Sequence, residues 1–218
     1  MATTNPIIFM PANDGEETGR ADIYGLLAAL FAAPPSTGLL ESIATAPTDD
    51  MSESVLEQAW RALVGAAQQV LATGGAEAVR EEYEKLFIGI GKPEVMLYGS
   101  FYLSGFLMEK PLAALRTDLA QLGLERADNV VESEDHIASL CEVMRYLIAS
   151  DEADTAIPPV SDVVRLAHQK TFFGTHMQPW VNDMCIALDN HRQSNFYQFV
   201  GQLAMHYFEV EAQAFDIG

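Results

Sequence analysis

The short stretch from Glu132 to His136 holds the ionisable side chains best placed for chemistry: Glu132, Glu134, Asp135 and His136. An imidazole beside a carboxylate can work as an acid and base pair, or it can hold a ligand. A simpler interpretation is a helix start, because Ser133 can cap the helix and the helix dipole favours acidic residues in its first turn. The position of His136 favours a functional role over a simple helix cap, since it lies beside Asp135 at the edge of an apolar stripe.

The apolar stripe that follows this cluster predicts one buried face of a helix. Its members recur at steps of three and four residues: Ile137, Leu140, Cys141, Met144 and Ile148. A helix over 132–148 would hold a half-buried imidazole, fixed by a carboxylate, at the rim of a groove.

Motifs of the common enzyme classes are missing from the sequence. It has no phosphate-binding loop, no GxGxxG after a strand, no HExxH and no GxSxG. Glu132 and His136 are four residues apart, but the other histidines do not repeat that spacing with glutamate, as a metal site in a helical bundle requires. We therefore expect no metal and no cofactor. The alternative that stays open is a helical enzyme, or a small-ligand or metal-binding protein, that uses Asp135 and His136.

The charge balance restricts the classes of partner. With 12 Lys and Arg against 31 Asp and Glu, the net charge is −19. Such a protein repels nucleic acid and anionic membrane surfaces, so we expect neither nucleic acid binding nor stable membrane association. A basic peptide would be attracted.

The cysteines and the N-terminus predict a cytoplasmic protein. Cys141 and Cys185 lie far apart in apolar helical contexts, as reduced buried thiols do. The N-terminus has no Lys or Arg before Arg20, unlike a secretory signal. The longest charge-free run is broken by Pro34 and Pro35, which a membrane span would not tolerate.

Helical periodicity recurs along the chain and no useful strand pattern does. We predict a loose N-terminal tail over residues 1–18 and one all-α domain over 19–218, a bundle of about eight to ten helices. The expected helices cover 21–33, 39–43, 51–73, 76–89, 111–124, 132–148, 160–175, 179–190 and 194–214. Whether the protein is a monomer or a dimer stays open.

A loop containing glycine and proline leads into an aromatic, almost uncharged stretch that begins at Leu97. The run of Tyr98, Phe101, Tyr102 and Phe106 is more typical of a core than of a ligand surface. A loop can nevertheless present such side chains to a partner. Trp180, after a proline, has the same two interpretations.

Together these stretches resemble the TorD/DmsD/NarJ family of redox-enzyme maturation chaperones, from about Arg20 to about Tyr207. The resemblance rests on LFAAPPS at the end of the first helix, on EEYEKLFIGIG followed by LYGSFYL, and on ESEDHIASLCEVM, with support from FFGTHMQPW. The fourth of these stretches, ESEDHIASLCEVM, matches the family signature Glu-Pro-x-Asp-His-Ile. This chain departs from the family by having Ser133 in place of the signature proline and Leu97 in place of the proline before the aromatic loop.

The resemblance implies a cytoplasmic chaperone, not an enzyme. Members bind the precursor catalytic subunit of a molybdenum-cofactor oxidoreductase until the cofactor is inserted, and many then release it to twin-arginine export. The family's motifs imply that leader or partner binding here involves Tyr98, Gly99, Ser100, Phe101, Tyr102, Glu132, Asp135 and His136. A scaffold subunit that stays in the mature complex is a further alternative.

Overall fold

The computed structural model describes residues 15–49, 51–89, 91–127, 130–149 and 161–217. Within these ranges the fold is all-α, as predicted, with ten α-helices, one short π-helical segment and no strand. The helices are α1 Gly15–Ala32, α2 Thr37–Ala44, α3 Val55–Thr73, α4 Gly75–Tyr83, α5 Gly99–Ser104, α6 Lys110–Gln121, α7 Ile137–Ala149, α8 Asp162–His176, α9 Val181–Asp189 and α10 Phe196–Ile217; the π-helix η1 is Glu84–Ile88. No helix in these ranges is long and apolar enough to cross a membrane.

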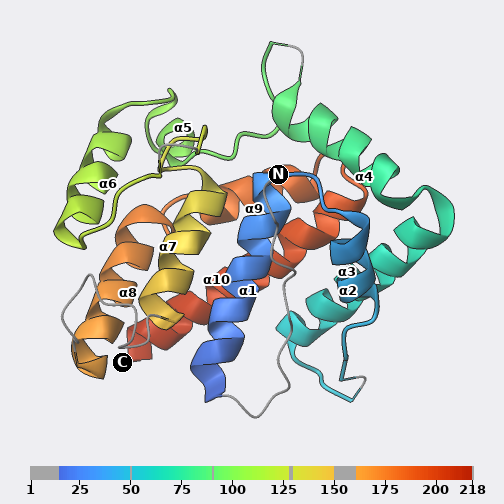
Figure 1. Ribbon diagram of the computed structural model, residues 1–218, viewed down its shortest axis with the longest axis horizontal. Helices are drawn as coiled ribbons and strands as arrows, with labels where there is room; N and C mark the ends of the chain where they lie inside the picture. Colours follow the sequence, from blue (N-terminus) through green and yellow to red (C-terminus); the bar gives the residue numbers. More distant parts are fainter. Residues whose placement is uncertain (1–14, 50, 90, 128–129, 150–160, 218) are drawn as a thin grey trace.

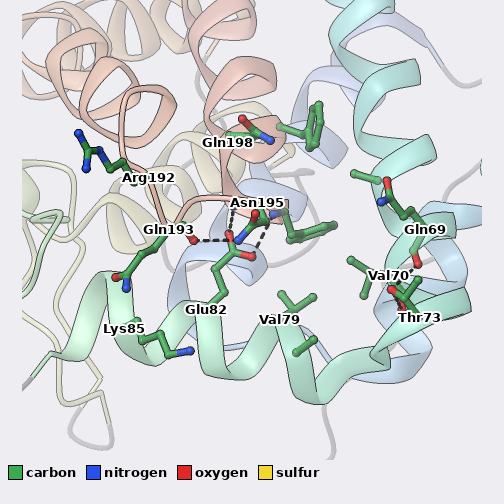
Figure 2. Close-up of a pocket in the computed structure, with 14 residues that line it drawn as sticks. Gln69, Val70, Thr73, Val79, Glu82, Lys85, Arg192, Gln193, Asn195 and Gln198 are labelled. Atoms are coloured by element: carbon green, nitrogen blue, oxygen red, sulfur yellow. Dashed lines mark hydrogen bonds between the residues drawn. The ribbon is translucent and has the colours of Figure 1, made fainter.

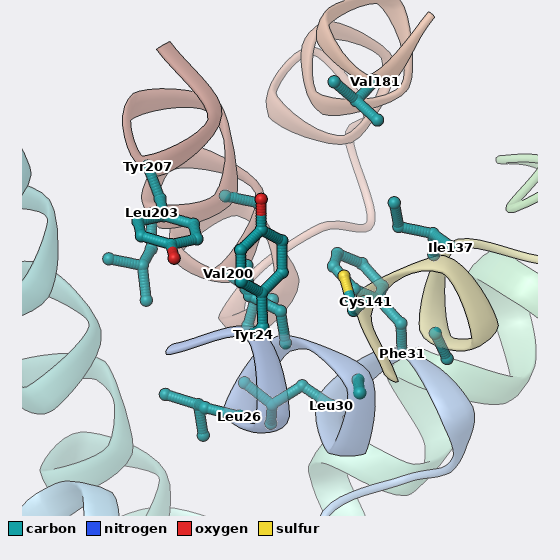
Figure 3. Close-up of a cluster of buried hydrophobic side chains, with 14 of the residues drawn as sticks. Tyr24, Leu26, Leu30, Phe31, Ile137, Cys141, Val181, Val200, Leu203 and Tyr207 are labelled. Atoms are coloured by element: carbon teal, nitrogen blue, oxygen red, sulfur yellow. The ribbon is translucent and has the colours of Figure 1, made fainter. Parts of the chain in front are cut away.

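The centre of the bundle is formed by α1 and α7, which pack along each other in front of α10 (Figure 1). Tyr24 and Phe31 from α1, Cys141 from α7, and Val200 and Tyr207 from α10 point into one shared core (Figure 3). All five are almost completely buried. The stripe predicted to follow the acidic cluster is therefore the central seam of the fold, and Cys141 is a free, buried thiol.

A buried ion pair ties the first helix to the last. The Arg20 guanidinium donates to both carboxylate oxygens of Glu211, at 2.7 and 2.8 Å, and the Tyr24 hydroxyl donates to Glu211 at 3.1 Å. Glu211 is only 2% exposed, so these donors replace the water that it loses. The same interactions fix α1 against the C-terminal part of α10.

Most predicted helices are observed, with differences at their bounds: the helix predicted over 76–89 is divided into α4 and η1, and the one predicted over 111–124 ends at Gln121. α1 begins at Gly15, within the predicted tail of residues 1–18, while residues 1–14 lie outside the described part of the chain. The predicted helix over 132–148 begins only at Ile137, so Glu132–His136 lie just before its first turn and not within it. The short helix α5 was not predicted, because its sequence carries glycine, serine and aromatic residues without a clear periodicity.

The start of α10 is held by a side chain from a distant helix. The carboxylate of Glu82, on α4, accepts hydrogen bonds from the backbone N–H groups of Asn195, Phe196 and Tyr197, at 2.8 to 3.0 Å (Figure 2). These donors belong to the first turn, where no intrahelical acceptor exists. Glu82 thus takes the place of the local cap that most helices supply from their own sequence.

Replacing Glu82 by alanine should destabilise the fold. Three N–H groups, of which those of Phe196 and Tyr197 are buried, would lose a charged acceptor, and we expect the free energy of unfolding to fall by about 2–4 kcal/mol. Urea denaturation followed by circular dichroism measures the change. The control is Glu84→Ala, which removes an exposed carboxylate two residues further along. Equal effects of the two substitutions would show that the cap contributes nothing.

Candidate functional site

Asp135 joins the signature to the aromatic loop. Its backbone oxygen accepts from Gly99 N and its Oδ2 accepts from Ser100 N, both at 2.9 Å. Beside these bonds, Ile137 N donates to Leu97 O at 2.8 Å. The carboxylate is therefore the acceptor for the first turn of α5, and two segments far apart in sequence are fixed as one unit.

The two residues beside Asp135 have roles that differ from those predicted. Ser133 does not cap α7; its hydroxyl donates to Asp135 Oδ1 and holds the carboxylate in place. The cap of α7 is His136, whose Nδ1 accepts from Ala138 N at 3.2 Å. The neutral ring then carries its proton on Nε2. At the position of the signature proline, this chain restrains the turn with a hydrogen bond.

His136 is kept neutral by its surroundings. It is 4% exposed, and the Tyr98 ring meets its imidazole edge to face with 5.0 Å between centroids. Burial lowers the pKa of His136, against the opposing influence of the carboxylates of Glu132 and Asp135. A neutral, buried imidazole that caps a helix is part of the frame of the site.

Glu132 and Tyr98 close the same unit at its outer side. The Tyr98 hydroxyl donates to Glu132 Oε2, and both side chains are half-buried. Burial, and then the hydrogen bond and charge of Glu132, raise the pKa of Tyr98 above its ordinary value. Both side chains are therefore partly accessible to solvent at the outer side of the signature.

Gly99 is required by a close approach of two segments. A Cβ at Gly99 would lie 2.9 Å from the indole Nε1 of Trp180 and 3.0 Å from Cε2, which a real side chain cannot do. Trp180 is almost fully buried, donates through Nε1 to His176 O, and stacks on the Tyr102 ring at 5.4 Å. Trp180 is thus a core anchor, and the base on which α5 rests.

An exposed apolar segment, Leu103–Met108, begins in the last turn of α5 and continues beyond it. Phe106 and Met108 are 70% and 76% exposed, and Leu103 and Leu107 are also exposed. The Ser100 hydroxyl accepts from Met108 N at 3.3 Å, which ties this segment back to the loop. The sequence favoured a core position for Phe106 over presentation at the surface, and the structure exposes the ring. The only available signal was the lack of helical periodicity after Tyr102.

The arrangement of Asp135 and His136 does not favour an enzyme that uses them. Both oxygens of Asp135 and the Nδ1 of His136 already accept hydrogen bonds, and both residues are 4% exposed. Neither residue lines the cavity beside α3 and α4, the cavity between α1 and α7, or the smaller one beside α8 and α10. Among the residues that the structure describes, no group of three or more His, Cys, Asp and Glu could hold a metal ion.

Two larger cavities lie beside the bundle. One of about 570 Å³ separates α3 and α4 from the start of α10 and contains Glu82, whose carboxylate is already used (Figure 2). The other, of about 460 Å³, lies between α1, α7 and the segment that joins α6 to α7. Its lining is mostly apolar, and it includes Glu134 and Ala138, which flank the signature pair.

Exposed apolar side chains on a rigid helical frame are typical of proteins that bind other polypeptides. Residues 52–186 match the family model described as nitrate reductase delta subunit. This match covers more than half of the chain, so the protein belongs to that family, which comprises molybdoenzyme maturation chaperones of the NarJ/TorD type. A search of curated proteins finds no match to the chain.

Replacing Asp135 by alanine should release α5 from α7. Ser100 N and the Ser133 hydroxyl would both lose their acceptor, and we expect a loss of about 1–3 kcal/mol in the free energy of unfolding. Hydrogen exchange of residues 99–104 should accelerate more than exchange in α10. Asp135→Asn keeps an acceptor and should show a smaller effect; an unchanged exchange rate in Asp135→Ala would contradict the assigned role.

His136 should make stability depend on pH. Because the folded state holds its pKa below the ordinary value of 6.5, the unfolded chain binds a proton more readily. The stability that the neutral imidazole contributes is therefore fully present above about pH 6.5. The free energy of unfolding falls as the pH drops below this value. His136→Asn retains a capping acceptor without the titration, so its stability should change less between pH 7 and pH 5. Identical pH profiles in denaturant melts would contradict this.

Proposed function

We propose that this protein is a cytoplasmic chaperone that binds the precursor of a molybdenum-cofactor oxidoreductase, through its leader and its apo-subunit. It assists cofactor insertion and delays export until the enzyme is mature. Membership of a molybdoenzyme maturation family supports the class of client. The observation that carries the proposal is the exposed apolar segment Leu103–Met108, held beside the signature by Asp135 and Ser100.

The predicted site residues would then divide into two kinds. Gly99, Ser100, Asp135 and His136 are buried and would act by fixing the loop. The partly exposed residues would face the client together with Phe106 and Met108; these are Tyr98, Phe101, Tyr102 and Glu132. A substitution of Asp135 or His136 would weaken binding by displacing the loop.

Charge and apolar area together suit a reversible complex. A net charge of −19 attracts a basic leader. Burying about 400 Å² of apolar surface contributes roughly 10 kcal/mol. Ordering a flexible peptide and losing its free motion offset several kcal/mol of this, which leaves an affinity near micromolar. Such a complex can form and later release its client.

Phe106→Ser should weaken the complex with the apo-subunit by roughly tenfold or more, because a large exposed ring is removed from the centre of the apolar segment. Isothermal titration calorimetry of the full-length protein with the purified apo-subunit measures the affinity. Added salt should lower this affinity further. The matched control is Val55→Ser, at an exposed apolar position on α3. If the wild-type protein shows neither heat nor complex with leader or apo-subunit, the proposed function is wrong.

A further inference from the structure

The two thiols of this chain are shielded from oxidants by the core. Cys141 and Cys185 are free and almost completely buried. Burial raises the pKa of Cys185 to about 12, and it raises the pKa of Cys141 well above the ordinary value. Because the thiolate is the form that a peroxide oxidises, neither cysteine reacts readily at neutral pH. Exposed methionine thioethers are therefore the sulfur groups that a peroxide can reach.

The nine methionines differ widely in exposure. Met1 and Met10 lie outside the described residues, and Met205 is half-buried. Four others are almost completely buried: Met96, Met144, Met177 and Met184. Among the described residues, the two largely exposed methionines are Met51 and Met108, at 89% and 76%. We therefore expect these two thioethers to react before the buried ones.

Met108 differs from Met51 in its surroundings, because it ends the exposed apolar segment Leu103–Met108. The Ser100 hydroxyl accepts from Met108 N at 3.3 Å, and the Ser104 hydroxyl donates to Phe106 O at 3.1 Å. The backbone of Met108 has a φ of +59°, a left-handed conformation that residues other than glycine seldom adopt. The two hydrogen bonds hold this turn, so the thioether is presented from a fixed backbone beside the rest of the apolar segment.

Oxidation by a peroxide would change the Met108 side chain from apolar to polar. The sulfur lone pair attacks one peroxide oxygen, the O–O bond breaks, the sulfur keeps that oxygen as a sulfoxide, and water leaves. Sulfur loses two electrons and the peroxide gains them. A sulfoxide accepts hydrogen bonds, so its burial against an apolar partner is unfavourable. The leucines and the phenylalanine of the segment have no group that reacts in this way, so the response depends on Met108.

We propose that Met108 is an oxidation-sensitive site, and that a peroxide weakens client binding by converting its thioether to the sulfoxide. This inference rests on the proposed function, because Met108 belongs to the segment assigned to the client. Reduction of the sulfoxide by a methionine sulfoxide reductase, with a thiol as the electron donor, restores the apolar side chain. The chaperone would thus bind less client under oxidising conditions and recover without new synthesis.

The test treats the full-length protein with hydrogen peroxide, removes the peroxide, and measures binding of the purified apo-subunit by isothermal titration calorimetry. Peptide mass spectrometry follows each methionine, and Met51 and Met108 should each gain one oxygen before the buried methionines do. We expect conversion of Met108 to weaken binding roughly tenfold, because burial of a methionine side chain contributes at least this factor. Methionine sulfoxide reductases A and B with dithiothreitol should restore the affinity.

Three variants separate Met108 from the other methionines. Met108→Leu keeps an apolar side chain of similar volume without the sulfur, so peroxide should leave its affinity unchanged. Met51→Leu is the matched control at the other exposed thioether, and peroxide should weaken its binding as it does for the wild type. Met108→Gln places a polar group of similar length at this position, so it should bind weakly before any treatment.

The outcomes distinguish this inference from the proposed function. A wild type that keeps its affinity after Met108 has been converted would overturn the inference, and so would an equal loss of affinity in Met108→Leu. Oxidation of the buried methionines ahead of Met108 would also overturn it. In each of these results the untreated protein still binds the apo-subunit, so the proposed function stands. An untreated wild type that binds no client overturns the proposed function, and this inference falls with it.

Discussion

A single carboxylate holds the signature and the aromatic loop of this protein together. Asp135 accepts from Ser100 N and from the Ser133 hydroxyl, and its backbone oxygen accepts from Gly99 N. With these bonds, the aromatic loop and the start of the central helix become one rigid body, which rests on buried Trp180. Removing this buried carboxylate is costly, because each donor would lose its acceptor and no water could replace it.

The same frame explains how two surfaces of different character can lie on either side of one short motif. On one side the chain leaves α5 and exposes Phe106 and Met108; on the other, Glu134 and Ala138 enter the wall of the cavity between α1 and α7. The motif residues themselves stay inside. A substitution at the motif would therefore affect both surfaces together, whereas a substitution on one surface should leave the other intact.

The sequence predicted the all-α class and most helices, because three- and four-residue periodicity survives in every long helix. The family resemblance implied that Asp135, His136 and the aromatic loop act together, and the structure places these segments in contact. The sequence could not reveal that His136 caps α7 in place of Ser133, since both residue types can accept the bond. Nor could it show that Glu82 caps α10 from a distant helix, or that Phe106 is exposed, because both depend on tertiary contacts.

The ion pair between Arg20 and Glu211 spans 191 residues of sequence. During synthesis the guanidinium is made long before its acceptor leaves the ribosome. Until then α1 lacks both this partner and the α10 face that covers Tyr24. The bundle can therefore close only after α10 has been made, and a chain cut short before α10 would expose the apolar face of α1.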